Sequence, residues 1–251
     1  MDFNADIGES FAGYELGLDS EIVKYITSAN IATGFHAGDP DWMARTVSLA
    51  VENGVGIGAH PAYPDLGGFG RRNMDLTPDE VSNAVTYQVG ALAAFAPARK
   101  LQHVKPHGAL YNTAVRDADV AEAVVSAIKA FDPELIHVVL AGSQWEAIAR
   151  NHGVRVAREC YADRAVTPEG TLVPRGHAGA VIHDPEAVVE RSLKLSTTGR
   201  VTAIDGTEID FSADSICLHG DTPEAVDIAR AVKTALQDAG ITLKCFDGRS
   251  S

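Results

Sequence analysis

The stretch Val55-Gly56-Ile57-Gly58-Ala59-His60 is a short apolar run that ends on a histidine and leads into a long loop. Three other runs, widely separated in the chain, follow the same plan: Ile31-Ala32-Thr33-Gly34-Phe35-His36, Val104-Lys105-Pro106-His107 and Ile216-Cys217-Leu218-His219. The first residues form a similar run that ends on Asp6 and is followed by Glu9. This repeated order of strand, polar residue, loop and helix is typical of a β/α barrel, in which side chains at the carboxyl ends of parallel strands converge on one rim.

Strand and helix patterns alternate over most of the chain. Apolar runs predict further strands at 102–106, 136–140, 154–158 and 242–246, and short β excursions at 171–175 and 199–212. Helical periodicity and capping residues predict helices at 19–28, 40–53, 77–95, 117–131, 143–152, from 184 onward and at 222–239. We therefore expect one α/β domain over residues 1–251, a β/α barrel of parallel strands. The alternation leaves open whether seven or eight strands close it.

Composition restricts the function classes. The formal net charge of −13 argues against nucleic-acid binding, which needs clustered lysines and arginines. The first residues contain neither a basic region nor an apolar stretch, so we expect no signal peptide and no membrane association. Three cysteines without CxxC spacing fit reduced thiols better than disulfides or a zinc ribbon. These features predict a soluble, cytoplasmic protein.

Five residues at or near the predicted strand ends are the candidate catalytic groups. Asp6 and Glu9 suit a general acid/base pair, because neighbouring carboxyl groups have different pKa values. The alternative for Glu9 is a cap on the following turn. The imidazoles of His36, His60 and His107 titrate near neutral pH, so each can bind a ligand or move a proton. Any one of them alone would be interpreted as a structural histidine.

A second group of residues is expected to bind the substrate. Lys105 lies two positions before His107 and therefore on the same face of its strand; pointing inward, it would need a carboxylate such as Asp6 or that of a substrate. Outward, it would be a solvated lysine. Arg71 and Arg72, in the Gly-rich loop 61–72, can clamp an anion or pin the loop by ion pairs. The remaining members of the group are Asp163, Arg164 and His219.

A metal site and a nucleotide site are two further possibilities. Asp6, His36 and His60 form a carboxylate–histidine set that suits Zn²⁺. However, HExxH spacing is absent, and an inward Lys105 would repel a cation, so no metal is firmly predicted. The chain also lacks GxxxxGK[ST], and it has no GxGxxG between a strand and a helix.

Several ordered motifs resemble one family. They are 4–10 (NADIGES), 28–40 (SANIATGFHAGDP), 58–61 (GAHP), 65–72 (DLGGFGRR), 104–112 (VKPHGALYN) and 218–223 (LHGDTP), with 159–164 (ECYADR) and 170–175 (GTLVPR) also similar. Together they span essentially the whole chain and resemble the LamB/YcsF family. The resemblance implies a seven-stranded barrel of the glycoside hydrolase/deacetylase type. It also implies ATP-dependent opening of 5-oxoproline to glutamate, with ATP as co-substrate and two partner subunits.

One departure from the family pattern bears on the chemistry. Thr33 stands where the family commonly has cysteine, so a thiol is not required there, and we expect Cys160 and Cys217 to be structural. Two other functions stay open. One is a metal-dependent amidohydrolase or carbohydrate deacetylase that needs no ATP, and the other is a non-catalytic subunit that binds 5-oxoproline.

Overall fold

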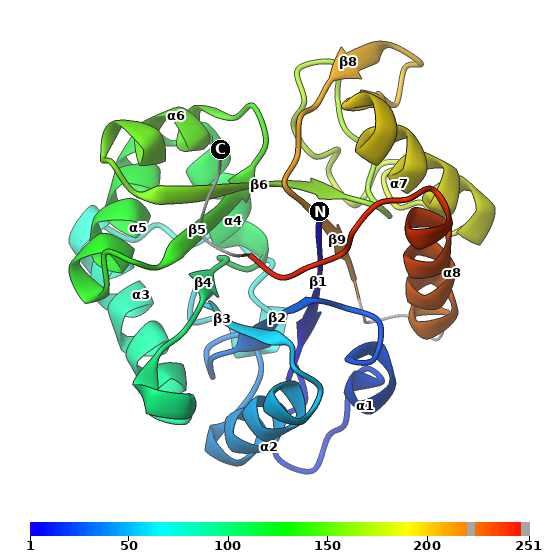
Figure 1. The fold of residues 1–251 in the computed structure, drawn as a ribbon. Helices are drawn as coiled ribbons and strands as arrows, with labels where there is room; N and C mark the ends of the chain where they lie inside the picture. The colour runs from blue at the N-terminus through cyan, green and yellow to red at the C-terminus, as the bar shows by residue number, and fades with distance from the viewer. Residues whose placement is uncertain (220–223, 247–251) are drawn as a thin grey trace.

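Seven parallel strands close a barrel in the computed structural model, which describes residues 1–219 and 224–246 (Figure 1). Their order around the barrel is β1-β2-β3-β4-β5-β6-β9. The strands are β1 (Asp2–Ile7), β2 (Ser28–Ala32), β3 (Gly56–His60), β4 (His103–Val104), β5 (Ile136–Leu140), β6 (Arg155–Tyr161) and β9 (Ser215–Leu218). The predicted β/α barrel is confirmed, and the seven strands are those that the family resemblance implied.

Helices surround the barrel (Figure 1). They are α1 (Asp19–Ile22), α2 (Pro40–Glu52), α3 (Pro78–Ala93), α4 (Gly108–Arg116), α5 (Ala118–Phe131), α6 (Gln144–Asn151), α7 (Pro185–Thr198) and α8 (Ala225–Asp238), with short 3₁₀ turns at Leu66–Gly68 and Pro97–Arg99. Two predicted starts are confirmed by their caps. The Asp39 side chain accepts from the backbone of Trp42, and Thr77 forms a capping box with Glu80. In the described residues, no helix has the length and apolar character needed to cross a membrane.

Three element predictions were wrong. The helix expected over 19–28 ends at Ile22, because Ser28 already belongs to β2 and bonds the Asp2 carboxylate inside the barrel. Helix α4 was not predicted; it occupies the space between the fourth strand and the expected helix 117–131. Residues 242–246 form no strand. The cap expected at 222–223 lies outside the described residues, while the antiparallel pair β7 (Arg200–Thr202) and β8 (Glu208–Asp210) confirms the β excursion predicted at 199–212.

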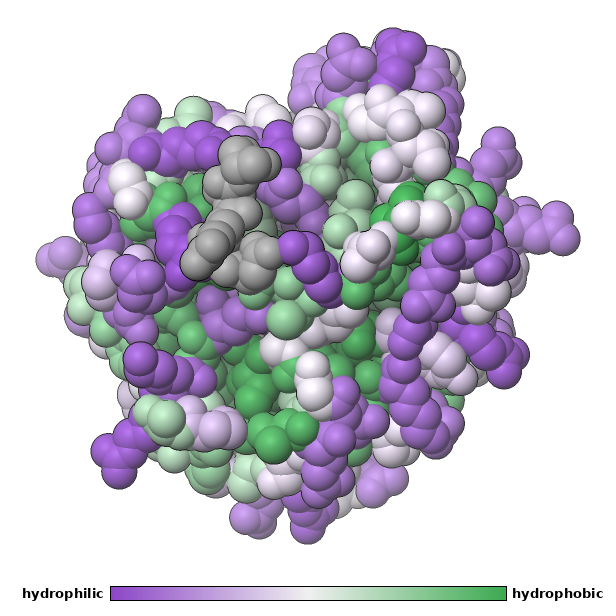
Figure 2. Space-filling view, in the orientation of Figure 1, coloured by the Kyte–Doolittle hydropathy of each residue, from purple (hydrophilic) through white to green (hydrophobic). Residues whose placement is uncertain are grey.

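The segment after α8 instead closes the barrel at the amino ends of its strands (Figure 1). The Met1 ammonium donates to Thr242 O, and the amide of Lys244 donates to Met1 O. Phe246 packs beside Ile136 and Val138 of β5. Figure 2 shows this face: hydrophilic side chains dominate the periphery, and hydrophobic ones show nearer the middle. The opposite, carboxyl end of the barrel is therefore the end available for a site.

Polar side chains fill the inside of the barrel. All of β1 is buried, and its side chains alternate between polar and apolar residues, DFNADI. Asn30 donates to Asn4 Oδ1 at 2.7 Å and to Asp6 Oδ1 at 2.9 Å, and Asn4 donates to Glu159 Oε1 at 3.1 Å. The apolar residues of the strand, such as Phe3, belong to the hydrophobic core. This network of hydrogen bonds extends inside the barrel to the carboxyl ends of the strands, where Asp6 lies.

Candidate functional site

The rim brings together residues from four strand ends. His60 is the last residue of β3, and Asp6 lies near the end of β1. His36 lies in the loop after β2, while Lys105 and His107 follow β4. All five are buried. The expectation that these side chains share one end of the barrel is met by the fold.

Three imidazoles and one carboxylate form a compact cluster. The rings of His36 and His107 stack with their centroids 3.9 Å apart. His107 Nδ1 lies 2.9 Å from His60 Nε2. Glu9 Oε1 lies 3.1 Å from His36 Nε2 and 3.4 Å from His107 Nδ1. One possible ligand atom from each of the four residues lies within 4.8 Å of the others.

This four-residue group differs from the sequence-predicted metal set of Asp6, His36 and His60. Glu9 and His107 join the two histidines, and Asp6 is not part of the group. Asp6 turns instead toward Lys105, although its Oδ2 still lies 3.2 Å from His60 Nε2. Spacing in the sequence could not identify this set, because its four members come from three different connecting segments and one strand end.

Lys105 is enclosed between two carboxylates. Its Nζ lies 3.0 Å from Asp6 Oδ1 and 3.0 Å from Glu159 Oε1, and it is 1% exposed. It also lies 2.9 Å from Cys217 Sγ and 3.3 Å from Asn4 Oδ1. Lys105 therefore points inward and meets Asp6, the protein carboxylate that the sequence suggested. With acceptors from the protein already surrounding its three N–H groups, it does not line the cavity described below.

The electrostatics of this ion pair fix the charge of Asp6. Burial raises the pKa of the Asp6 carboxyl, but His60 and Lys105 outweigh burial and hold it well below its usual range. Burial also lowers the pKa of Lys105, but Asp6 and its other anionic neighbours outweigh this and raise it well above normal. Both groups are charged at neutral pH. An ionised carboxylate at the rim can accept a proton or stabilise a positive charge.

Burial keeps two of the histidines in their neutral form. Desolvation, helped by the neighbouring imidazoles, holds the pKa of His36 and of His107 well below the usual histidine value. Both rings are therefore neutral at pH 7. A neutral imidazole keeps a lone pair on one nitrogen, which is the form that accepts a proton or binds a metal ion.

A polar cavity of about 660 Å³ opens above the cluster. Its lining combines the candidate residues Asp6, His107, Arg71, Arg164 and His219 with others that include Arg175, Asn112, Tyr111 and Tyr161. A smaller hollow of about 270 Å³ shares Asp6 and Arg71 with it and adds Glu9. Arg71 thus borders both spaces. The cationic lining suits an anionic small molecule.

The far wall of the cavity is built around His219. The Asp163 carboxylate accepts from His219 Nδ1 at 2.8 Å, and the His219 ring stacks on Tyr161 with centroids 5.3 Å apart. Arg164 is held by the carbonyls of Val173 and Ala180, at 2.7 and 3.2 Å. The sequence placed Asp163 among the binding residues. In the structure it orients His219 and is absent from the cavity lining.

Arg72 lies away from both spaces. Its side chain is 70% exposed and pairs with Asp65, whose carboxylate also accepts from the backbone of Gly68. Of the two interpretations given for the arginine pair, loop pinning therefore describes Arg72, whereas Arg71 reaches the cavity. Adjacent residues on this tight turn point in different directions.

The cysteines do not provide a reactive thiolate in this site. Burial raises the pKa of Cys160 to about 11 and that of Cys217 well above its usual value. A protonated, buried thiol is a weak nucleophile. Thr33, the residue that replaces the family's cysteine, bonds Gln88 at 2.9 Å and the His60 carbonyl at 3.2 Å.

Glu159 and Tyr161 of β6 are site residues that the sequence reasoning missed. Glu159 is fully buried and contacts Lys105, and Tyr161 supports His219. The strand was expected to end at residue 158, which placed both beyond it. Extending the strand with a period of two would have put these side chains on one face, toward the barrel interior.

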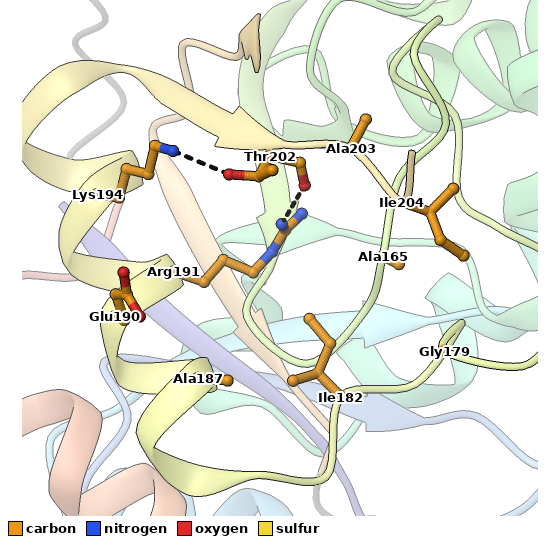
Figure 3. Close-up of a pocket in the computed structure, with 10 residues that line it drawn as sticks. All are labelled: Ala165, Gly179, Ile182, Ala187, Glu190, Arg191, Lys194, Thr202, Ala203 and Ile204. Carbon is orange, nitrogen blue, oxygen red and sulfur yellow. Dashed lines mark hydrogen bonds between the residues drawn. The ribbon is translucent and has the colours of Figure 1, made fainter. Parts of the chain in front are cut away.

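A further hollow, of about 430 Å³, lies outside the barrel beside α7 (Figure 3). Arg191 donates to Thr202 O at 3.0 Å and Lys194 donates to Thr202 Oγ1 at 2.9 Å. None of the sequence-predicted site residues lines it. The candidate chemistry is therefore concentrated at the carboxyl end of the barrel.

Known proteins match this chain over nearly its whole length. It is 56% identical over 245 residues to a 5-oxoprolinase subunit of Thermococcus onnurineus, covering 97% of this chain and 96% of that protein. It is 54% identical to the corresponding 5-oxoprolinase subunit of Pyrococcus horikoshii, with the same coverage. Among solved structures, the lactam utilization protein from Thermus thermophilus has a TM-score of 0.93 and 48% identity, covering 98% of this chain and 99% of that one.

A more distant structure supports the fold alone. A GH113 β-1,4-mannanase superposes with a TM-score of 0.54 at 11% identity, over 94% of this chain and 98% of that one. The family model described as LamB/YcsF family matches residues 1–250. The ordered motifs, the seven-stranded barrel and these matches agree, and the chain therefore belongs to the LamB/YcsF family.

Proposed function

We propose that this chain is a subunit of an ATP-dependent 5-oxoprolinase, a hydrolase that opens the lactam ring of 5-oxoproline to give glutamate. The observation that carries the proposal is the cationic cavity above the ionised Asp6. The relatives from Thermococcus and Pyrococcus, both named as 5-oxoprolinase subunits, support the same activity. Those names also support partner chains, and we propose two. We further propose a cytoplasmic location, which the three free cysteines support.

The cavity offers anchors for the substrate carboxylate. Arg71, Arg164 and His219 line it and carry or can carry positive charge. Arginine binds carboxylates through two parallel hydrogen bonds, which fixes the orientation of the ligand as well as its charge. We assign substrate capture to this group. Lys105 is assigned a different role, holding Asp6 ionised, because it is enclosed by protein acceptors.

The chemistry of the lactam explains the use of ATP. A five-membered lactam is a resonance-stabilised amide, and its ring closure is favoured because both ends are already tethered. Phosphorylating the lactam oxygen makes the lactam carbon a strong electrophile. Water adds to this carbon, the ring C–N bond breaks to leave an acyl phosphate, and a second water releases inorganic phosphate and glutamate, so that ring opening is coupled to ATP hydrolysis. This chain has no nucleotide motif that we recognise, so we assign the phosphorylation step to a partner subunit.

Asp6 is assigned the proton transfer that activates water. A carboxylate with so low a pKa is a weak base, so it removes a proton from water slowly unless the electrophile is already activated. An activated lactam meets that condition and an unactivated one does not. His107 lines the cavity beside Asp6 and is neutral, so it is the second group placed to accept the proton when no metal ion occupies its Nδ1.

The test is a glutamate-release assay with 5-oxoproline and ATP, run with the chain alone and with its candidate partner subunits. We expect turnover in the assembled complex, with one ADP formed for each glutamate. If a complex with Asp6→Asn binds 5-oxoproline tightly and keeps full turnover, the catalytic role of Asp6 is contradicted. The chain would then be a subunit that only binds 5-oxoproline. Equal glutamate release with and without ATP would contradict the ATP-dependent proposal.

The histidine cluster favours one other function, a metal-dependent amidohydrolase or deacetylase that works without ATP. Imidazole and carboxylate ligands suit the divalent ions that such enzymes use. This function predicts activity from the chain alone that a chelator removes. The same assay therefore separates the two functions, by omitting ATP in one arm and adding chelator in another.

A further inference from the structure

Two backbone carbonyls determine which nitrogen of each ring carries its proton. His60 Nδ1 lies 2.6 Å from Lys105 O, and His107 Nε2 lies 2.9 Å from Phe69 O. A carbonyl oxygen only accepts, so each of these nitrogens must be the donor. When both rings are neutral, His60 Nε2 and His107 Nδ1 are therefore the nitrogens that carry lone pairs.

These two lone pairs face one another and two carboxylates. The two nitrogens are 2.9 Å apart. His60 Nε2 is 3.2 Å from Asp6 Oδ2, and His107 Nδ1 is 3.4 Å from Glu9 Oε1. With both rings neutral, four acceptor atoms thus surround a buried point, and neither ring nitrogen that faces the other carries a proton. Such an arrangement repels itself unless a cation, either a proton or a metal ion, lies among the acceptors.

We propose that Glu9, His36, His60 and His107 form a binding site for a divalent transition-metal ion of the Zn²⁺ type. Three imidazoles and one carboxylate match the ligand preferences of Zn²⁺, Co²⁺ and related ions, whereas Mg²⁺ and Ca²⁺ prefer oxygen. The proposal is independent of the proposed function, because binding of the metal ion can be measured without enzymatic turnover.

The ligand spacing fits tetrahedral coordination. With bonds of about 2.0–2.1 Å to Zn²⁺, neighbouring ligand atoms of a tetrahedron are about 3.3 Å apart. Three of the separations are 2.9, 3.1 and 3.4 Å, and every pair lies within 4.8 Å. Small side-chain rotations close the longer pairs. The rings of His36 and His107 stack nearly parallel, so one of them must also turn to aim its in-plane lone pair at the ion. The rest of the site is formed before the ion binds.

The outer contacts are those that metal-binding histidines commonly have. A ligating histidine usually donates its other N–H to a carbonyl or carboxylate, which fixes the ring. His60 donates to the Lys105 carbonyl and His107 to the Phe69 carbonyl in this way. Both carbonyls belong to the backbone beside the site, so the ring orientations are determined by the fold itself.

The charge balance removes the objection that Lys105 repels a cation. Lys105 lies between Asp6 and Glu159, at 3.0 Å from each. Asp6, Glu159 and Glu9 together carry three negative charges if ionised, and Lys105 supplies one positive charge. A divalent ion bound by neutral histidines would bring this buried group close to neutrality. The cluster thus attracts a divalent cation despite the nearby lysine.

The test is direct titration of metal-free protein with Co²⁺. We expect one equivalent to bind, with the visible absorption bands of tetrahedral Co²⁺, and Zn²⁺ to displace it. His60→Gln, His107→Gln and Glu9→Gln should each weaken Co²⁺ binding at least tenfold. His219→Gln is the matched control, because His219 lines the same cavity outside the cluster; its Co²⁺ binding should equal that of the wild type.

A second readout separates loss of ligand from loss of fold. Zn²⁺ should raise the Tm of the wild type and of His219→Gln, and it should leave the Tm of the three ligand variants unchanged. Unaltered Co²⁺ binding in those variants, provided that circular dichroism shows native folding, would overturn the assignment of ligands. A wild-type protein that binds less than a tenth of an equivalent would overturn the metal site altogether and leave a shared proton between His60 and His107.

Discussion

At the scale of single residues, Asp6 is the group whose state depends most on its neighbours. His60 and Lys105 keep its pKa low, against the effect of burial. We predict that Asp6→Asn lowers kcat of the assembled complex by about 10²–10⁴-fold with little change in KM, because a general base acts mainly in the transition state. Steady-state glutamate release measures this. Asp41→Asn, an exposed change on α2, is the control and should keep wild-type kcat.

Lys105 should matter for stability more than for substrate affinity. Lys105→Met leaves Asp6 and Glu159 without their shared cation, and removing one member of a buried ion pair costs about 3–5 kcal/mol. Urea unfolding measures the loss. Lys24→Met removes an ion pair that is half exposed, and it should cost no more than about 1 kcal/mol. Equal losses in the two variants would contradict the enclosed role of Lys105.

Arg71 and Arg72 test the assignment of substrate capture. Arg71 borders both hollows, whereas Arg72 pairs with Asp65 outside them. We predict that Arg71→Ala raises KM for 5-oxoproline about tenfold or more, since a hydrogen bond to a charged group contributes about 1.5–3 kcal/mol. Arg72→Ala, one position away, should change KM less than about twofold, because an exposed ion pair that holds a loop contributes little. A larger effect from Arg72 would reverse the assignment.

The sequence could predict the rim but not the contacts within it. Residues that follow parallel strands converge at one end of a barrel, so Asp6, His60 and His107 were identified from order alone. Tautomers and metal-ligand sets depend on the paths of loops, which place Glu9 near His36 and His107. Nothing in the local pattern encodes that approach.

At the scale of elements, helices with a capping signal in the sequence were predicted where they occur, and a helix without such a signal was missed. Asp39 and Thr77 precede Pro at the first helical position, and both helices begin where expected. Helix α4 lacks such a signal, because its N-cap is His107, whose side chain makes no capping bond. That position serves the site instead of the helix start. A residue of the candidate site thus occupies the cap position that would otherwise have marked the element.

Gly70 shows how a loop shapes the site. Its φ is +65°, and an added Cβ would lie 2.8 Å from His107 Cδ2 and from His36 Cβ. We predict that Gly70→Ala lowers activity at least tenfold, because it displaces rings of the candidate site, and a displacement of a fraction of an ångström is costly for a group that takes part in the reaction. Gly54 has nearly the same φ, +66°, but open space around it, so Gly54→Ala reports backbone strain alone, about 1–2 kcal/mol. Activity and thermal unfolding of both variants separate the two effects.

At the scale of the whole molecule, the barrel buries many ionisable groups. Burial lowers the pKa of His103 and of His137 to about 3, and it raises the pKa of Asp2 and of Asp19 to about 6. The two kinds of group act oppositely on stability. The buried histidines contribute stability above pH 6.5 that is lost as the pH falls. The aspartates contribute stability below pH 3.8 that is lost as the pH rises toward 6.

These opposing contributions overlap between about pH 4 and pH 6, so the wild-type profile alone conceals each of them. A variant that removes one histidine exposes its share. His137 is 1% exposed, and its ring nitrogens have no hydrogen-bond partner among the described residues, so a phenyl ring can replace it without leaving a partner unsatisfied.

We predict that His137→Phe becomes more stable relative to the wild type as the medium becomes more acidic. A histidine whose pKa falls from 6.5 to about 3 costs about 1.4 kcal/mol of unfolding free energy for each pH unit below 6.5. Between pH 7.5 and pH 5, the difference between variant and wild type should therefore shift by about 2 kcal/mol in favour of the variant. Urea unfolding at the two pH values measures this shift. Subtracting the difference found at pH 7.5 removes the contribution of any packing change that the larger ring causes. A difference independent of pH would mean that His137 gains its proton without unfolding, and that this part of the barrel is open to water.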